Sequence, residues 1–263
     1  MKGGWHLSRK GATPPFGSAL GHLTSSLTQI LNIQLVGLTN WLIINVTKKS
    51  RGRGRRRQED RSAASRSRLL NAAAIEFAAR GFAGANVDRI ARAARVNKAM
   101  IYYHFNSKAA LYREILRDMF EAVAVRVTDA AQAPSNPDDK VRAFVEAIAV
   151  EAEARPHFPP IWFREIAENG AHLDGPTVAH MSRIISALAR ILGEGADAGR
   201  FHPVNTLLVH AAIVGPLLLY FASDQLRRRL ARGGIPAAVS VSRDEVVAHV
   251  QRLALMALEG RTA

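Results

Sequence analysis

Side chains that can bind phosphates or base edges are concentrated in VNKAMIYYHFNSKAAL, residues 96–111. Lysines can pair with phosphates, while tyrosine hydroxyls and histidine nitrogens can hydrogen-bond to phosphate oxygens or to the edges of bases. Ile101 and Phe105 are spaced by four residues, which places them on one helix face as core residues. The stretch therefore combines a buried face with a polar, aromatic one. The alternative is that Tyr102 packs in the core and that His104 is an ordinary surface histidine; for Tyr102 we favour the exposed position.

An amphipathic helix is predicted upstream of this stretch. Leu69, Ala73 and Phe77 recur at four-residue spacing within the Ala-rich segment 67–82, and alanine favours the helix. Gly81 is a natural helix stop. This segment is expected to support the elements that follow.

Two short helices joined by a tight turn come next. Asn86 can cap a helix over 87–94, the chain breaks at 95–96, and a second short helix is expected over about 98–105. Ser107 can cap the helix that follows. Two short helices after one longer helix form a helix-turn-helix, in which the second short helix enters the major groove of DNA.

The segment LLNAAAIEFAARGFAGANVDRIARAARVNKAMIYYHFNSKAALYREIL resembles the N-terminal domain of the TetR/AcrR family of transcriptional regulators, over about residues 66–115. The pattern is carried by Phe77, Gly81, Ile90, Ala91, Ala94, Val96, Tyr102, His104, Phe105, Lys108 and Leu111. The resemblance implies an all-helical homodimer whose fourth helix links three DNA-binding helices to a larger ligand-binding domain. Most members repress transcription and release DNA when a small molecule binds.

The resemblance also implies which residues contact DNA. By position, Asn86 and Lys108 would contact phosphates. The groove-facing set would be Lys98, Ala99, Met100, Tyr102, Tyr103 and His104. Arg95 stands where the family usually has Gly, so a left-handed backbone would cost about 1 kcal/mol there, recovered through a phosphate contact. Met100 replaces a Thr or small residue, so no base preference is transferred.

The positive charge is concentrated near the N-terminus. The chain carries a formal net charge of +14, and residues 48–68 contain ten Lys or Arg against two acidic residues, a net charge of +8. The mixture of Gly and Arg in 51–57 cannot bury apolar surface, so we expect a disordered basic arm that neutralises phosphates, or only a solubilising tail. We therefore predict an N-terminal extension over 1–61, a helix-turn-helix domain over 62–112 and a helical ligand-binding and dimerisation domain over 113–263.

Residues 30–46 are mostly apolar and precede the basic run. They could anchor a DNA-binding sensor in a membrane with the positive residues on the cytoplasmic side, although the run is short and polar residues interrupt it. They could instead be disordered, or residues 1–45 could lie outside the native protein if translation starts at Val46. We favour these over the anchor, and expect a cytoplasmic protein.

The C-terminal half is predicted to be helical throughout. Helices are expected over 138–154, 161–173, 175–195, 203–231 and 243–258. Ser242 and Glu245 form a capping box for the last of them, and Pro216 is expected to kink the fourth.

The run 203–222 has no formal charge and could be a membrane span. We favour burial instead, because a helix that is apolar all round suits a core or an interface. In the family layout the last two long helices, 203–231 and 243–258, form the homodimer contact. The helix over about 107–131 is expected to act as the lever that relates effector binding to the DNA-binding helices.

An apolar effector site is expected in this half. Its candidate residues are Phe158, Trp162, Phe163, Met181 and Phe221, which could equally be filled core. His172, His180 and His210 are too scattered to indicate a metal site, so neither a metal nor a cofactor is expected.

The sequence contains no set of residues that would support an enzyme mechanism. The chain has no cysteine, no phosphate-cradling glycine loop, no G-x-S-x-G and no paired metal-binding histidines. We therefore predict an all-α protein of about nine helices that is no enzyme. It would be a ligand-responsive regulator, most consistent with a repressor, that binds a palindromic operator as a homodimer and responds to an unidentified small molecule.

Overall fold

The computed structural model describes residues 52–259, with side chains from residue 61 onward. This part of the chain is all helical, as expected, with ten α-helices where about nine were expected, and one short 3-10 helix, η1 (Pro236–Val239). The chain divides into two compact units, 1–61 and 62–263. The segment 30–46 lies outside the described residues.

The first described helix, α2 (Gly52–Gly84), is longer than expected. Its final part buries Leu69 and Phe77 completely, and the backbone leaves helical geometry at Gly81, where φ is 68°. The helix stop predicted at Gly81 is thus present. The arm was expected to be irregular up to residue 61, but residues 52–61 are helical, which agrees with the high helix propensity of arginine.

Three further helices complete the N-terminal half: α3 (Val87–Ala93), α4 (Ala99–Phe105) and the long α5 (Lys108–Gln132). The predicted caps at Asn86 and Ser107 are both confirmed, since their side chains accept hydrogen bonds from the Asp88 and Ala110 amides. These caps satisfy amides that the first helical turn leaves unpaired.

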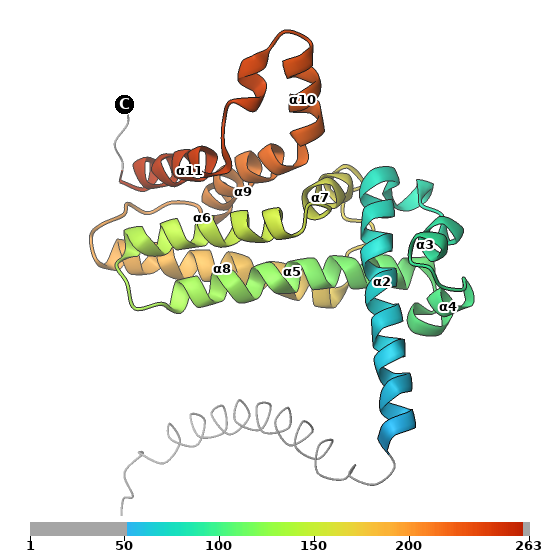
Figure 1. The fold of residues 1–263 in the computed structure, drawn as a ribbon. Coiled ribbons are helices and arrows are strands. Elements are labelled where there is room, and N and C mark those ends of the chain that lie inside the picture. Colours follow the sequence, from blue (N-terminus) through green and yellow to red (C-terminus); the bar gives the residue numbers. More distant parts are fainter. Residues whose placement is uncertain (1–51, 260–263) are drawn as a thin grey trace, which may run out of the picture. The chain divides into compact units, whose positions relative to one another are not determined.

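The C-terminal helices pack around α5. Figure 1 shows α5 running beside α6 (Pro137–Ala154) and α8 (Gly175–Asp197), and both of these also contact α9 (Thr206–Ala222). The last helix, α11 (Arg243–Leu258), packs on α6 and α9, and its predicted capping box between Ser242 and Glu245 is present. The apolar stripes of these helices form one continuous core with the N-terminal helices.

The prolines of two helices behave differently from expectation. The short helix α7 (Phe158–Ala167) starts at Phe158 rather than at 161, because prolines in its first turn need no backbone N–H partner. Pro216 lies inside α9 without ending it. The break falls instead at Ser223, before α10 (Asp224–Arg232), where the Ser223 hydroxyl and the Arg227 guanidinium both bond to the Tyr220 carbonyl.

Within residues 52–259, no single helix is both long and apolar enough to cross a membrane. Only α9 and α10 together pass a test of length and composition, and they are bent by 59°.

Candidate nucleic-acid interface

The turn between α3 and α4 has a defined geometry. Val96 N–H bonds to the Ala91 carbonyl at 3.0 Å and Arg95 N–H to the Arg92 carbonyl at 3.1 Å, which is the Schellman pattern of helix termination. Arg95 has φ of 55°, so the left-handed conformation expected for it is confirmed. The side chain of Arg95 is exposed beside α4.

Helix α4 has a buried face and an exposed face. Ile101 and Phe105 are buried, as predicted, while Tyr102 is 47% exposed and Tyr103 is 73% exposed. The core alternative for Tyr102 therefore fails. Lys98 and Ala99 are exposed too, whereas Met100 is only half exposed and packs against the core. The exposed face of α4 offers a cation, two phenols and a small residue to a partner.

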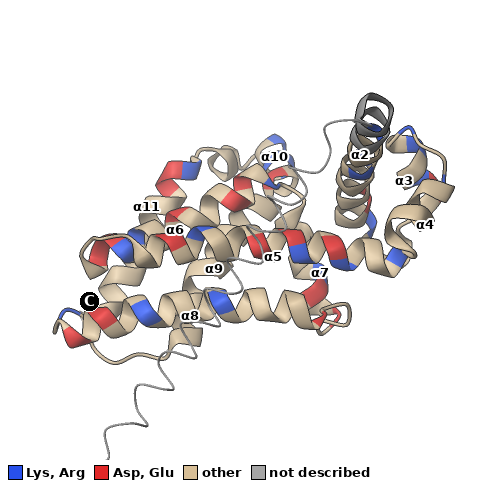
Figure 2. Cartoon of the chain, turned by 90° about the horizontal axis from the view of Figure 1, so that it is seen from below, with Lys and Arg blue, Asp and Glu red and all other residues tan. Residues whose placement is uncertain are grey.

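Several cations near this face already have partners. The Lys98 ammonium lies 2.9 Å from the Asp88 carboxylate, and the hydrogen bond that Lys98 donates to Asp88 raises the pKa of Lys98. The Lys108 ammonium lies 4.7 Å from the centre of the Phe82 ring and 3.4 Å from the Ala83 carbonyl. A phosphate would have to share or displace these contacts. Figure 2 shows acidic and basic residues intermixed along the neighbouring helix α5.

His104 occupies a half-buried position beside Tyr103 and near Arg66 of α2. Its ring meets that of Tyr103 edge to face at 5.0 Å, and its Nε2 atom is buried without a hydrogen-bond partner in the described part of the chain. Burial, then the nearby Arg66 charge, lowers the pKa of His104, which favours the neutral ring.

Sequence reasoning missed Arg66 and Arg68. The Arg66 guanidinium stacks 5.2 Å from the Phe105 ring and pairs with Glu114, and Arg68 Nε donates to the Ala94 carbonyl at 3.2 Å. Both hold α2 against the helix-turn-helix. Their spacing along α2 gave no signal, because these partners are 26 to 48 residues away.

A small apolar cavity lies in the C-terminal half, with a volume of about 70 Å³. Six of its lining residues are Phe120, Phe158, Trp162, Met181, Ile184 and Leu218. Phe158, Trp162 and Met181 belong to the expected effector set. Phe163 and Phe221 do not line this cavity; Phe163 is 36% exposed on the outer side of α7.

His210 is the one ionisable residue on the cavity wall among the described residues. Burial lowers the pKa of His210, and no hydrogen bond from it forms within residues 61–259. A neutral imidazole is therefore available to a bound molecule.

A polar cluster joins α7 to the end of α2. The Arg164 guanidinium donates to the Ala79 carbonyl at 3.2 Å, and the fully buried Glu165 accepts from the Tyr112 hydroxyl at 2.8 Å. The ring of His172 lies 4.1 Å from that of Phe82. Arg164 and Glu165, which we did not assign from sequence, thus connect α7 to α2 and α5.

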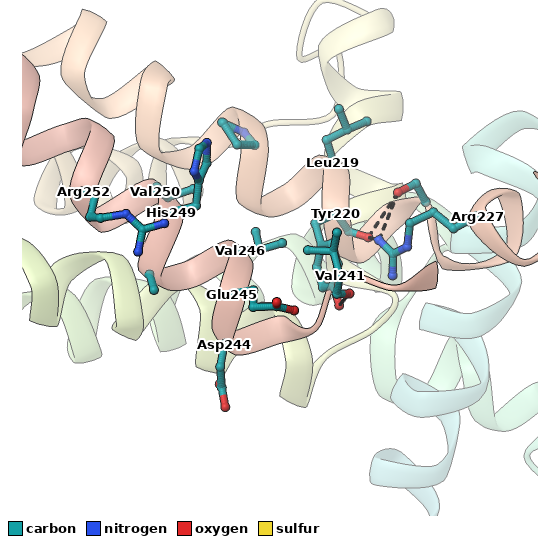
Figure 3. A pocket seen from close by; sticks show the side chains of 13 residues that line it. Leu219, Tyr220, Arg227, Val241, Asp244, Glu245, Val246, His249, Val250 and Arg252 are labelled. Atoms are coloured by element: carbon teal, nitrogen blue, oxygen red, sulfur yellow. Dashed lines mark hydrogen bonds between the residues drawn. The ribbon is translucent and has the colours of Figure 1, made fainter. Parts of the chain in front are cut away.

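A larger, open groove of about 890 Å³ lies between α9, α10 and α11. Figure 3 shows that Leu219 and Tyr220 come from α9, whereas Glu245 and His249 come from α11. Arg227 closes one end through its contacts with Tyr220 and Ser223. Charged and apolar side chains alternate around this groove.

A helix-turn-helix with an exposed second helix, packed in one continuous core with further helices, is the arrangement of a DNA-binding transcription factor. Comparison with known proteins agrees. Residues 69–115 match the family model "Bacterial regulatory proteins, tetR family", and residues 137–250 match "Tetracyclin repressor-like, C-terminal domain". The two matches together span more than half of the chain, and the protein belongs to the TetR family.

Relatives give the same result. The chain is 28% identical over 202 residues to the HTH-type transcriptional repressor SCO4008 of Streptomyces coelicolor, covering 72% of this chain and 95% of that protein. It is 37% identical over 82 residues to the HTH-type transcriptional activator FasR of Mycolicibacterium smegmatis, covering 31% of this chain and 37% of that one. The solved structure of the fatty acid degradation regulator FadR from Bacillus halodurans shares the fold, with a TM-score of 0.60 and 19% identity over 75% of this chain and 97% of that one.

The protein is accordingly a DNA-binding transcriptional regulator. TetR-family regulators are transcription factors without enzymatic activity, in agreement with the prediction from the motifs.

Proposed function

We propose that the protein is a repressor that binds a palindromic operator as a homodimer and leaves it when a small apolar molecule binds. The observation that carries the proposal is the exposed face of α4, where Tyr102 and Tyr103 project beside Lys98 on a capped helix-turn-helix. Repression is supported by SCO4008, a named repressor that is matched over nearly its whole length, whereas the activator FasR is matched over a third.

DNA contact would divide between two kinds of side chain. Tyr102, Tyr103, His104, Ala99 and Met100 are proposed for the groove. The proposed phosphate-contacting residues are Asn86, Arg95, Lys98 and Lys108. The amide end of Asn86 is exposed while its oxygen caps α3, so capping leaves it a free donor.

Binding to the DNA flanking the protein's own gene tests the proposal, over a salt series and against random competitor. Specific binding that survives competitor at physiological salt is expected, and footprinting would reveal two half-sites about 34–36 Å apart. Tyr103→Ala should weaken specific binding about tenfold or more, since a base contact contributes about 1–3 kcal/mol. Tyr103→Phe removes only the hydroxyl and so separates its contribution to binding from that of the aromatic ring. Binding without sequence preference in every salt would contradict a specific regulator.

The effector would be small and mainly apolar, since aromatic and aliphatic side chains surround the cavity and His210 is the available hydrogen-bonding group. Met181→Trp would fill much of the space. A compound that releases the wild-type protein from DNA should lose its effect on this variant, which should still bind DNA. A response that persists in Met181→Trp would place the effector elsewhere.

A homodimer is supported by apolar surface on the last helices. Leu208 and Leu219 on α9 are 71% and 61% exposed, and Leu253 and Met256 on α11 are also exposed. Figure 2 shows that α9 carries no Lys, Arg, Asp or Glu. Contiguous apolar surface of this kind favours a protein interface. The groove of Figure 3 adjoins the same two helices and would lie beside the contact.

A further inference from the structure

Two carboxylates and an imidazole converge where α7 ends. Glu165 is in the last turn of α7. Glu168 is the first residue after this helix, and His172 comes four residues after Glu168. The Nδ1 atom of His172 lies 2.9 Å from Glu165 Oε1 and 3.5 Å from Glu168 Oε2, and the three ligand atoms all lie within 4.8 Å of one another.

These separations suit a metal ion. Tetrahedral Zn²⁺ forms bonds of about 2.0–2.1 Å to nitrogen and oxygen, which places its ligand atoms roughly 3.3 Å apart. The distances of 2.9 and 3.5 Å fall on either side of that value. A single N–H proton of His172 can bond well to only one carboxylate, whereas a cation at the centre would bind both.

The surroundings already orient the most buried ligand. Glu165 is 0% exposed, and its Oε1 accepts from the Tyr112 hydroxyl at 2.8 Å while its Oε2 accepts from the His172 backbone N–H at 3.3 Å. Donors that fix a ligating carboxylate in this way are typical of metal sites.

Charge also favours a cation here. Within residues 61–259, no Lys or Arg forms an ion pair with Glu165, so the histidine is its only potentially cationic hydrogen-bond partner. A carboxylate removed from water needs a compensating charge. Glu168 is 40% exposed, which leaves a path for an ion and room for a water molecule as fourth ligand.

We propose that Glu165, Glu168 and His172 form a binding site for one divalent transition-metal ion of the Zn²⁺, Co²⁺ or Ni²⁺ class. An imidazole with two carboxylates selects these ions over Mg²⁺ and Ca²⁺, which take oxygen ligands. The site links the end of α7 to α2 and α5, because the His172 ring packs on the rings of Phe82 in α2 and Tyr112 in α5. An ion bound there stabilises this junction. The proposal does not depend on the proposed function.

The experiment uses the full-length chain after treatment with chelator. Titration with CoCl₂ is followed by the visible absorption of tetrahedral Co²⁺, and titration with ZnCl₂ by calorimetry. We expect one ion per chain. Glu168→Gln should weaken binding about tenfold or more, the scale on which metal sites respond when supporting groups are removed, and His172→Ala should abolish the Co²⁺ band. His249→Ala, an exposed histidine on α11, is the matched control and should bind as wild type does.

Two readouts keep the test decisive. Glu168 is exposed, so Glu168→Gln should fold normally by circular dichroism, and Zn²⁺ should raise the melting temperature of the wild-type protein but not of this variant. Absence of binding, or binding unchanged in both Glu168→Gln and His172→Ala, would overturn the proposal. DNA binding by the metal-free chain is measured separately, so failure of the metal site leaves the proposed function intact, and the reverse also holds.

Discussion

At Arg95 the backbone conformation favours glycine, whereas a role in DNA binding favours a positively charged side chain. Arg95 takes the left-handed position of the α3 turn, where glycine has no steric cost, and yet it presents a guanidinium next to α4. Keeping arginine there is reasonable if the guanidinium meets a phosphate. The two contributions can be separated by substitution.

Arg95→Gly should stabilise the fold while weakening DNA binding. Relief of about 1 kcal/mol of backbone strain is partly offset by about 0.5 kcal/mol of extra glycine entropy, so urea denaturation should show a gain of roughly 0.5 kcal/mol. The slope of log K against log salt should become shallower by about 0.9, because one phosphate is no longer neutralised. Arg95→Lys keeps the charge and the strain and should change neither. An unaltered salt slope in Arg95→Gly would mean that Arg95 contacts no phosphate.

At the scale of elements, Asp174 ties α8 to α5. Its side chain caps α8 by accepting from the Thr177 amide at 3.0 Å, and it pairs with Arg117 of α5 at 2.6 Å. Burial opposes ionisation, but these contacts outweigh it and lower the pKa of Asp174 to about 2. Because the folded pKa is below the ordinary 3.8, the stabilisation is complete above pH 3.8 and is lost as pH falls toward 2.

The variants Asp174→Asn and Asp174→Ala separate the contribution of the α8 cap from that of the ion pair with Arg117. Asparagine can still cap α8 but cannot pair with Arg117, so its deficit relative to wild type should be present at pH 7 and shrink between pH 4 and 2. Alanine loses the cap as well, at a further cost of about 1 kcal/mol. Denaturant unfolding across this range measures both. A deficit for Asp174→Asn that is the same at every pH would show that the ion pair contributes nothing.

At the scale of the whole molecule, the proposed homodimer can be tested on the exposed apolar side chains of α9 and α11. Leu208→Glu would place a charge in the centre of the proposed contact, where burying it without a partner is costly. We expect a monomer by light scattering and weaker operator binding. Leu226→Glu on α10 puts the same charge on another exposed leucine and should leave the dimer intact. A dimer that tolerates Leu208→Glu would move the interface elsewhere.

The N-terminal arm is proposed to act at the same scale, through its positive charge. Residues 62–263 form a unit by themselves, so deleting residues 1–57 should leave folding unchanged. The salt slope falls by about 0.9 for every phosphate that the protein no longer neutralises, so the truncated protein should bind DNA with weaker salt dependence. An equal slope in both proteins would mean that the arm does not contact DNA.

Local interactions explain what the sequence by itself determined. The caps at Asn86, Ser107 and Ser242 and the turn at Arg95 depend on residues within a few positions, so spacing and side-chain type were enough to predict them. The buried face of α4 follows from helical periodicity in the same way.

Interactions between distant segments were decided only by the tertiary structure. Lys108 lies over Phe82, 26 residues earlier, and Glu165 bonds to Tyr112, 53 residues earlier, so no local pattern reveals either pair. The same holds for the cavity, where packing of α5, α6, α7, α8 and α9 includes Trp162 and leaves its neighbour Phe163 outside the cavity and partly exposed. Sequence determines which face of a helix is apolar, but the packing of helices determines what that face meets.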